Sequence, residues 1–482
     1  MNITNILKGV SVLSITGNLN GDIDSVCFDS RKCIKGSLFV AVDGTLADGH
    51  QFIDKAIENG ANVIVYEKGD LGERDITMVK VDNSRKALAL IASNFYDHPS
   101  SKLNLVGITG TNGKTTTVTL LYNLFTNLGY CCGLISTISN YIGEEKIETE
   151  HTTPDPISLN NLIYKMVQKG CEYCFMEVSS HSLDQDRVLG LQFKGGIFSN
   201  LTHDHLDYHK TFAEYLKCKK SFFDSLSKDA FALVNIDDKN GEVMVQNTEA
   251  HIYKYSCHKM ADFRCKILEE NMDGMLLKID NTQFWSLFIG NHNAYNLLAV
   301  YATAILLGTD KYETLKYMSS LKSVSGRLEY LRGGKDLTAV VDYAHTPDAL
   351  ENTLKTLKET GKGRTLICVF GCGGNRDKTK RPEMGVIAAK FADKVIVTSD
   401  NPRFEKPEDI IEDIKNGLDK KALSKSLFIT DRKEAIRTAL MMAPEGSIIL
   451  VAGKGHENYQ IIGGEKSHFD DKEIIMNTFN EL

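Results

Sequence analysis

A glycine-rich loop lies between a predicted strand and a predicted helix. The apolar run Leu103–Thr109 leads into Gly110-Thr-Asn-Gly-Lys-Thr-Thr116, and leucines at helical spacing follow. In such loops backbone N–H groups close on phosphate oxygens, Lys114 adds a positive charge at the β- and γ-phosphates, and Thr115 can hold Mg²⁺. The usual spacing would place glycine at position 108, where this chain has isoleucine, so the loop is a variant. We predict that ATP binds at Gly110, Thr111, Asn112, Gly113, Lys114, Thr115 and Thr116; the alternative is a glycine-rich turn with a solvated lysine.

Candidate metal ligands follow two further predicted strands. Glu177 ends the run Tyr173–Val178, and His205 follows the run Gly196–Asn200. A carboxylate oxygen and an imidazole nitrogen are reasonable ligands for Mg²⁺ that phosphates already hold. His203, His205 and His209 together would alternatively suit zinc, although the nearby ATP loop accounts for a magnesium site without it.

Three lysines stand in a predicted helix soon after these histidines. From the residues alone, Lys217, Lys219 and Lys220 form a solvated helix face.

The elements that must position these residues alternate along the chain. Short β-branched runs alternate with longer helical patterns, which is typical of parallel sheets in α/β proteins. Because ligands bind at the carboxyl ends of parallel strands, the chemistry is expected there. The clearest predicted strands are Leu103–Thr109, Tyr173–Val178, Gly196–Asn200, Thr338–Tyr343, Thr365–Gly371, Lys394–Asp400 and Ser447–Gly453.

Length and composition restrict the class of protein. The 482 residues suggest three domains, and a net charge of −7 argues against nucleic-acid binding through a broad basic surface. No apolar run is long enough for a membrane span, and the N-terminal residues lack the pattern of a signal peptide, so we expect a cytoplasmic protein. The eleven cysteines, including the C-x-x-C of Cys171 and Cys174, are expected to be reduced structural thiols.

Two polar stretches suggest domain boundaries. They are residues 98–102, before the strand of the glycine loop, and residues 325–335, before a new series of strands. We therefore predict domains at residues 1–101, 102–324 and 325–482.

Six motifs in order extend the interpretation to nearly the whole chain. The glycine loop resembles that of the Mur ligases, the amino-acid-adding enzymes of peptidoglycan synthesis, and of folylpolyglutamate synthetase, which shares their fold. Within the Mur ligases the chain closely resembles the UDP-N-acetylmuramoyl-tripeptide synthetases, which add the third residue of the stem peptide. The motifs are Asp29-Ser-Arg31, Glu177-Val-Ser-Ser-His181, Asn200-Leu-Thr-His-Asp-His-Leu-Asp-Tyr-His209, Asp342-Tyr-Ala-His-Thr-Pro-Asp-Ala-Leu350, Gly371-Cys-Gly-Gly-Asn-Arg-Asp377 and Gly453-Lys-Gly-His-Glu457.

The resemblance implies an N-terminal UDP-sugar domain, a central P-loop-type ATPase domain and a C-terminal Rossmann-like domain for the incoming amino acid. It implies catalytic roles for Lys114, Glu177, His205 and Lys219. It makes Thr115, Glu177, His205 and Lys219 metal ligands, with Lys219 as the carbamylated N6-carboxylysine. Carbamylation would convert a cation that repels metal into a ligand.

The resemblance also implies two sets of substrate contacts. Asn296, Arg327 and Asp342 match positions that hold ATP. The UDP-sugar contacts it implies are Phe28, Ser30, Thr45, Leu46, Ala47, His151, Thr152, Thr153, Ser179, Gln185 and Arg187, and Arg187 could take a carboxylate of that substrate bidentately.

The amino-acid site is assigned from three successive strand ends. In this family D-N-P-R accompanies meso-diaminopimelate, whereas lysine would leave Arg403 unpaired, at roughly 1–3 kcal/mol. The residues are Arg376, Asp400, Asn401, Pro402, Arg403, Gly453 and Glu457.

The expected activity is ATP- and Mg²⁺-dependent addition of meso-diaminopimelate to UDP-N-acetylmuramoyl-L-alanyl-D-glutamate through an acyl phosphate. The substrates are small molecules, and we expect a cytoplasmic monomer without nucleic-acid or membrane partners. The alternatives are a lysine-adding tripeptide synthetase, a folylpolyglutamate synthetase-like ligase, and an ATP-driven switch that binds a protein partner.

Overall fold

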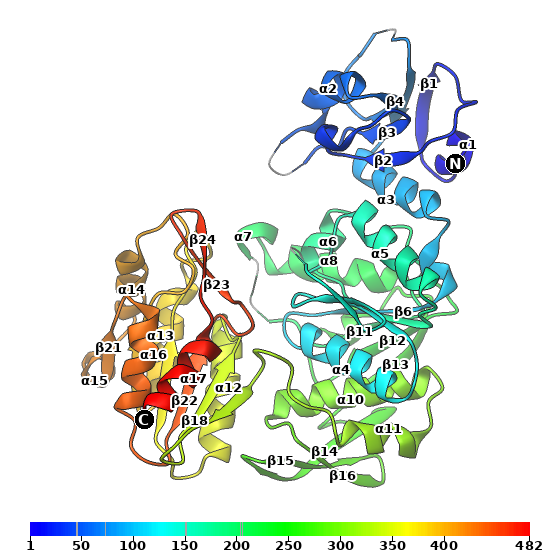
Figure 1. The fold of residues 1–482 in the computed structure, drawn as a ribbon. Coiled ribbons are helices and arrows are strands. Elements are labelled where there is room, and N and C mark those ends of the chain that lie inside the picture. The colour runs from blue at the N-terminus through cyan, green and yellow to red at the C-terminus, as the bar shows by residue number, and fades with distance from the viewer. Residues whose placement is uncertain (45–46, 73, 150–151, 203, 205) are drawn as a thin grey trace.

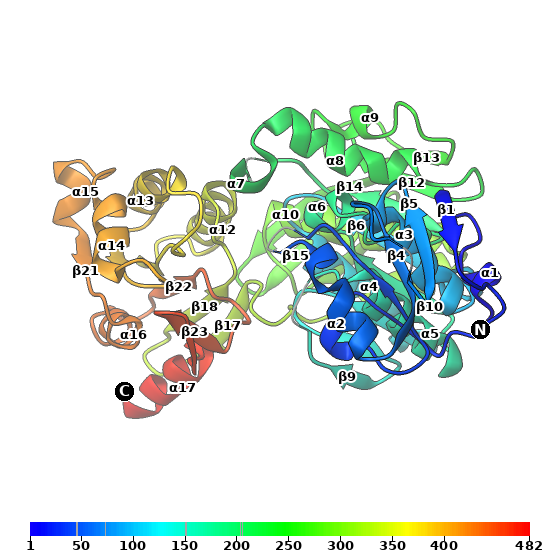
Figure 2. The ribbon, with the colours of Figure 1, turned by 90° about the horizontal axis from the view of Figure 1, so that it is seen from above.

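Three large sheets follow one another along the described chain, each covered by helices (Figure 1). The computed structural model describes residues 1–44, 47–72, 74–149, 152–202, 204 and 206–482. Seen from above, the part that carries the first sheet lies over the central part, and the C-terminal part lies to one side (Figure 2). None of the helices in these described ranges is long and apolar enough to cross a membrane.

The N-terminal sheet has the strand order β1-β5-β4-β3-β2 and is parallel except for the antiparallel pair β1 and β5. Ser93 Oγ donates to Gly190 O at 3.2 Å, which ties α3 to the central part. The elements are β1 Val12–Thr16, β2 Ser25–Cys27, β3 Ser37–Val40, β4 Ala61–Tyr66, β5 Thr77–Val81, α1 Ile3–Ile6, α2 Ile53–Glu58 and α3 Ser84–Phe95.

The central sheet has the order β16-β15-β14-β13-β12-β11-β6-β10-β7-β8-β9, with its parallel strands in the middle. Its strands are β6 Asn104–Thr109, β7 Cys132–Ile135, β8 Asn140–Ile142, β9 Glu145–Ile147, β10 Tyr173–Glu177, β11 Gly195–Phe198, β12 Phe231–Asn235, β13 His251–Ser256, β14 Phe263–Asn271, β15 Gly274–Ile279 and β16 Thr282–Ser286. Its helices are α4 Lys114–Asn127, α5 Pro156–Gln168, α6 Ser180–Asp184, α7 Leu206–His209, α8 Phe212–Asp224, α9 Gly241–Met244, α10 Asn291–Leu306 and α11 Lys311–Met318.

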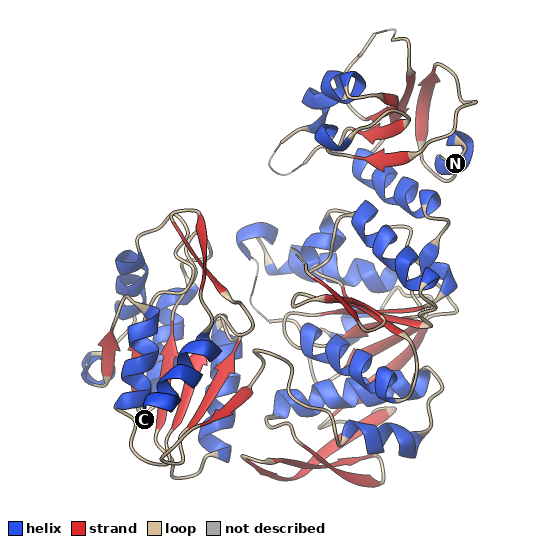
Figure 3. Cartoon of the chain, in the orientation of Figure 1, coloured by secondary structure: helices blue, strands red, loops and turns tan. Residues whose placement is uncertain are grey.

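Both faces of the central sheet are covered because its strands are apolar on both sides (Figure 3). Ile108 faces a buried cluster with Leu121 of α4 and Leu298 of α10. Leu105, on the opposite face, belongs to a second cluster with residues of α5 and α8. Because both faces of β6 are packed in apolar clusters, the strand is held in place, and with it the start of the glycine loop at its carboxyl end.

The C-terminal sheet has the order β17-β18-β22-β19-β20-β21 and is parallel except for β17. A hairpin of β23 and β24 follows it. The elements are β17 Glu329–Arg332, β18 Thr338–Asp342, β19 Leu366–Phe370, β20 Lys394–Val397, β21 Ser426–Phe428, β22 Ile448–Ala452, β23 Tyr459–Ile462, β24 Glu465–His468, α12 Pro347–Thr360, α13 Lys380–Phe391, α14 Pro407–Lys415, α15 Lys420–Ser424, α16 Arg432–Met441 and α17 Asp471–Glu481.

The predicted fold class, α/β with mostly parallel sheets, is confirmed. All seven strands predicted from apolar runs are present, each within a few residues of its expected ends. The eleven cysteines are free, as expected, and both Cys171 and Cys174 are buried. The domain boundaries proposed from composition remain predictions.

Candidate active site

The glycine loop connects β6, which lies between the parallel strands β11 and β10 of the central sheet, to α4. Gly113 has φ +89°, and a Cβ there would lie 2.5 Å from Asn296 Oδ1, so this position requires glycine. Lys114 Nζ donates to the carbonyls of Gly110 and Thr111, at 2.8 Å each. Burial lowers the pKa of Lys114, and Glu177 opposes that effect. The loop therefore holds the Lys114 side chain against its own carbonyls, and phosphate binding by this lysine stays a prediction.

Asn200, at the end of the strand next to β6, braces the same loop. Asn112 N donates to Asn200 Oδ1 and Thr111 N donates to Asn200 O, at 2.9 Å each. The sequence prediction quoted Asn200 in a motif but gave it no role. Its role could have been predicted from its position, because Asn200 follows a predicted parallel strand whose end lies beside the glycine loop.

A cleft of about 690 Å³ opens between the glycine loop and the C-terminal part. Asn112 Nδ2 donates to Asp348 Oδ2 at 2.9 Å across it. Six of the predicted ATP-binding residues line this cleft, namely Asn112, Gly113, Thr116, Asn296, Arg327 and Asp342. Aromatic side chains that were not predicted, Tyr255, Tyr295 and Tyr343, line it as well.

Arg327 links the two parts that form the cleft. Its Nη2 donates to Thr115 Oγ1 at 3.2 Å, and its guanidinium lies 4.4 Å from the centre of the Tyr343 ring. Its buried Nε has no hydrogen-bond partner among the described residues. A cation in this position can bind a phosphate or a ribose.

Asp342 has a clear local role. Its carboxylate accepts hydrogen bonds from Leu328 N at 2.8 Å, Ala344 N at 3.1 Å and Thr353 Oγ1 at 3.2 Å. It therefore holds the entry to β17 against the end of β18.

Glu177 ends β10 and is 1% exposed. Its Oε1 accepts a hydrogen bond from Thr137 N at 2.7 Å. The oxygen donors of Glu177 and Thr115 fit a hard cation such as Mg²⁺. His205, the third expected ligand, lies outside the described residues, as does His203, so the zinc alternative remains open. In the part of the chain that the structure describes, no group of three or more histidine, cysteine or acidic residues is arranged so that it could hold a metal ion.

The structure separates the three lysines of α8. Lys219 is 1% exposed, and its Nζ donates to Gly110 O at 2.9 Å and to Thr109 Oγ1 at 3.4 Å. Burial, and then the nearby Lys114, lower its pKa well below the ordinary value. Lys217 is exposed, and Lys220 pairs with Asp224 at 2.5 Å. A solvated face is therefore wrong for Lys219, whose side chain is turned inward by the apolar packing of α8.

Predicted UDP-sugar contacts meet beside Glu177. Thr153 Oγ1 donates to Glu177 O at 2.9 Å and accepts from Ser179 N at 3.3 Å. Arg187 donates to Thr153 O at 2.8 Å and through Nη2 to Gln185 Oε1 at 2.7 Å. The guanidinium is thus held in place by neighbours instead of forming the surface ion pair that is common for exposed arginines.

The remaining UDP-sugar contacts are placed as follows. Thr152 Oγ1 accepts from Thr137 Oγ1 at 3.1 Å. In the N-terminal part, Ser30 is buried, Phe28 is 39% exposed, and Ala47 O accepts from Gly44 N at 3.1 Å. Thr45, Leu46 and His151 lie outside the described residues.

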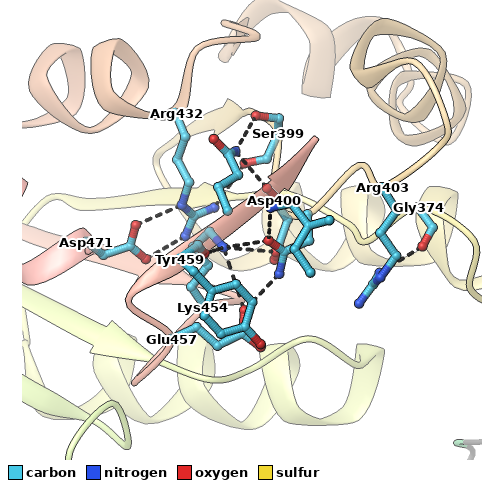
Figure 4. Close-up of polar contacts among 12 residues, drawn as sticks. Gly374, Ser399, Asp400, Arg403, Arg432, Lys454, Glu457, Tyr459 and Asp471 are labelled. Atoms are coloured by element: carbon cyan, nitrogen blue, oxygen red, sulfur yellow. Dashed lines mark hydrogen bonds and ion pairs between the residues drawn. The ribbon is translucent and has the colours of Figure 1, made fainter. Parts of the chain in front are cut away.

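The predicted amino-acid site gathers at adjacent strand ends of the C-terminal sheet (Figure 4). Gly453, after β22, has φ +114°, and a Cβ there would lie 2.5 Å from Asp400 Oδ2. Asn401 Nδ2 donates to Glu457 Oε2 at 2.8 Å. A Cβ on Gly373 would have Arg403 Nη1 at 3.0 Å and Arg376 Cγ at 3.9 Å, so both arginines flank this glycine. The structure thus brings together acids and arginines from loops far apart in sequence.

The two loops that carry the arginines are joined directly. Arg403 Nη1 donates to Gly374 O at 2.8 Å, and Gly374 N donates to Asn401 O at 2.9 Å next to Pro402. Arg381, which the sequence prediction missed, is fully buried and bonds Glu405 and Asp413. Its Nη2 also donates to Gly373 O at 3.2 Å.

Comparison with known proteins places the chain in a family. Residues 108–304 match the Mur ligase middle domain, residues 326–455 the Mur ligase glutamate ligase domain, and residues 22–96 the Mur ligase family catalytic domain. These matches, together with a glycine loop that faces the C-terminal part across the cleft, define the fold of a Mur-type ligase. The chain belongs to the Mur ligase family.

Relatives in this family are similar over the full length. A UDP-N-acetylmuramoyl-L-alanyl-D-glutamate–2,6-diaminopimelate ligase of Cytophaga hutchinsonii is 53% identical and covers 100% of both chains. The enzyme of that name from Phocaeicola vulgatus is 55% identical over 99% of both. A solved structure of such a ligase has 31% identity and a TM-score of 0.71, covering 100% of this chain and 99% of the other.

Proposed function

We propose that this chain is an ATP-dependent ligase that joins meso-2,6-diaminopimelate to UDP-N-acetylmuramoyl-L-alanyl-D-glutamate in peptidoglycan synthesis. One observation carries the choice of amino acid: Asp400, Arg403 and Glu457 meet at one edge of the C-terminal sheet. These opposite charges match an ammonium and a carboxylate on one carbon. The full-length relatives, which bear this activity in their names, support the same choice.

The first chemical step would take place at the glycine loop. A carboxylate oxygen of the nucleotide-sugar substrate attacks the γ-phosphorus of ATP, the bond to the β-phosphate oxygen breaks, and ADP leaves. Lys114, held on the loop carbonyls, stabilises the charge that develops on the phosphates. Arg187 and Thr153, adjoining Glu177, would orient the attacking carboxylate.

The second step forms the amide. The amine of diaminopimelate attacks the acyl carbon, loses a proton, and expels inorganic phosphate. Arg403, with Arg376 beside it, would bind the distal carboxylate, while Asp400 and Glu457 bind the distal ammonium group. Such fixed contacts bring the reacting amine to the acyl phosphate in one orientation.

Thr115, Glu177 and His205 would hold Mg²⁺, which supplies positive charge to the phosphate oxygens. Lys219 would serve as the carbamylated ligand. A free ammonium buried beside Lys114 would be repelled, whereas a carbamate formed from its amine and CO₂ gives an anion next to the loop. The eleven free thiols support a reducing compartment, and we propose a monomer in the cytoplasm.

The competing functions differ in substrate. A lysine-adding enzyme would leave Arg403 without a partner for its charge. Folylpolyglutamate synthase of Mycobacterium tuberculosis has the same fold at 15% identity and a TM-score of 0.61, which supports the fold alone.

The experiment is an assay of phosphate release from ATP with the UDP-linked dipeptide present, with and without diaminopimelate. We expect sustained release that requires both substrates. Steady hydrolysis that is indifferent to diaminopimelate would instead favour the ATP-driven switch and refute the ligase.

A further inference from the structure

Lys454 lies at the centre of the amino-acid site, although the sequence prediction gave it no role (Figure 4). Its side chain is fully buried. Its Nζ donates to Asn401 Oδ1 at 3.0 Å and to Tyr459 O at 2.6 Å. The same nitrogen lies 3.8 Å from Asp400 Oδ1 and 3.6 Å from Glu457 Oε2. One ammonium therefore touches three segments: the loop after β20, the loop after β22 and the start of β23.

A second buried cation near Lys454, Arg432, is already neutralised. Arg432 donates to both carboxylate oxygens of Asp471, at 2.8 and 2.7 Å, and both side chains are fully buried. Arg432 also donates to Ser399 O at 3.3 Å and Ala452 O at 3.0 Å, which fixes the strand ends before Asp400 and Gly453. This pair is a scaffold whose charges cancel.

The charges of Lys454, Asp400 and Glu457 do not cancel in this way. Lys454 is shared between Asp400 and Glu457, so the three groups together carry one net negative charge when all are ionised. Without Lys454, burial and the nearby Asp400 would act on Glu457 without this opposing cation, so Glu457 would bind a proton more readily. A protonated carboxyl group is a poorer acceptor for an ammonium group.

We propose that Lys454 is a positioning residue for the amino-acid substrate: its buried ammonium keeps Glu457 ionised and holds both Asp400 and Glu457 toward the distal ammonium group of diaminopimelate. This inference rests on the proposed function. A purely structural role would not predict a change with pH. The proposed role predicts that loss of Lys454 weakens diaminopimelate binding more at pH 7 than at pH 9.

The direction follows from the groups around Glu457. Burial and then Asp400 raise the pKa of Glu457, whereas Lys454, Asn401 and Arg403 lower it. Removing Lys454 takes away one of the influences that lower this pKa, so a smaller fraction of Glu457 is ionised at pH 7. The other titratable or charged groups facing this site are Tyr343, Tyr459, Arg432 and Asp471.

The test is the KM for diaminopimelate between pH 6 and pH 9, with ATP and the UDP-linked dipeptide saturating, in wild type and Lys454→Met. The ratio of the two KM values at each pH removes the titration of the substrate itself. We expect the variant's KM to be about 10- to 100-fold higher at pH 7, with the ratio falling toward pH 9, while the KM for ATP stays unchanged.

The matched control is Lys466→Met. Lys466 is exposed on β24 and lies 4.0 Å from the centre of the Tyr459 ring, which Lys454 approaches at 5.7 Å. It contacts the same ring without reaching the carboxylates, so its KM values should match the wild type at every pH. Glu457→Gln added to Lys454→Met should remove the new pH dependence.

Three results would overturn the proposal: a KM ratio that does not change with pH, an equal rise in the KM for ATP, or a loss confined to kcat. If Lys454→Met does not fold, Lys454→Gln keeps a hydrogen-bond donor without the charge and must show the same pH-dependent ratio. Wild-type enzyme that makes no product from diaminopimelate would refute the proposed function instead, since the ratio is defined only for an active ligase.

Discussion

Lys219 Nζ donates to the carbonyl of Gly110 at 2.9 Å, which ties helix α8 directly to the glycine loop. The same carbonyl accepts from Lys114 Nζ at 2.8 Å, so two lysines from different elements share one acceptor. Like charges in this arrangement repel, and chemical modification of the more buried lysine would relieve the repulsion.

Lys219→Ala should lower kcat by at least about 10²-fold, because the variant lacks the anion that a carbamate would provide. A short carboxylic acid added to the assay should restore part of the activity by occupying the vacated volume. Lys217→Ala, an exposed neighbour on the same helix, is the control and should keep wild-type activity. A fully active Lys219→Ala enzyme, or a ¹³CO₂-labelled wild-type enzyme without a carbamate NMR signal, would contradict the modification.

Lys114→Ala should lose at least about 10²-fold in kcat/KM, or about 2.7 kcal/mol of transition-state stabilisation, since one charge at the phosphates is removed. Steady-state kinetics with varied ATP measures the loss. Lys102→Ala, which removes a surface partner of Asp97 just before β6, should leave kcat/KM unchanged. Equal kinetics in both variants would show that the loop does not bind ATP as we describe.

Arg403→Ala should reduce kcat/KM for diaminopimelate far more than kcat/KM for lysine. Diaminopimelate loses a desolvated charge pair worth about 2–5 kcal/mol, roughly 30- to several-thousand-fold in kcat/KM, whereas lysine has no distal carboxylate to lose. The ratio of the two kcat/KM values, measured in wild type and variant, should therefore fall sharply. If kcat/KM falls by the same factor for both substrates, Arg403 supports the fold and does not select the amino acid.

Glu405 should contribute stability that disappears in acid. Hydrogen bonds from Arg381 lower the pKa of Glu405 from 4.5 to about 2. Because the folded-state pKa is depressed, the contribution is complete above about pH 4.5 and is lost as pH falls toward 2. Glu405→Gln should lower the free energy of unfolding by roughly 2–3 kcal/mol at pH 7, and by less as pH falls below 4.5.

Urea unfolding at several pH values measures this difference. Glu412→Gln on α14 removes an exposed pair with Lys415 and should change the free energy of unfolding by at most about 1 kcal/mol. A difference between wild type and Glu405→Gln that stays constant from pH 7 to pH 3 would contradict the role of the Arg381–Glu405 pair.

The sequence was informative where local pattern decides the outcome. Apolar runs such as Lys394–Asp400 predicted the strands, and parallel topology then predicted that Asp400 and Glu457 would lie at one edge. Lys219 could be distinguished from its neighbours only by family resemblance, since the positions of three lysines do not reveal which face of the helix is buried.

The supporting network could not be predicted in this way. Arg432 and Asp471 are 39 residues apart, and in the sequence each looks like an ordinary solvated charge. Their pairing arises only when α16 and α17 pack on the same face of the sheet. Arg381 and Lys454 were missed for the same reason: a buried charge is defined by partners that the fold supplies.

The most direct test of the central claim is a competition between equimolar diaminopimelate and L-lysine, with ATP and the UDP-linked dipeptide, read by the mass of the UDP-linked product. The charge pairing at Arg403 predicts that the diaminopimelate adduct exceeds the lysine adduct by at least about 30-fold. A product mixture dominated by lysine, or no tripeptide product at all, would contradict it.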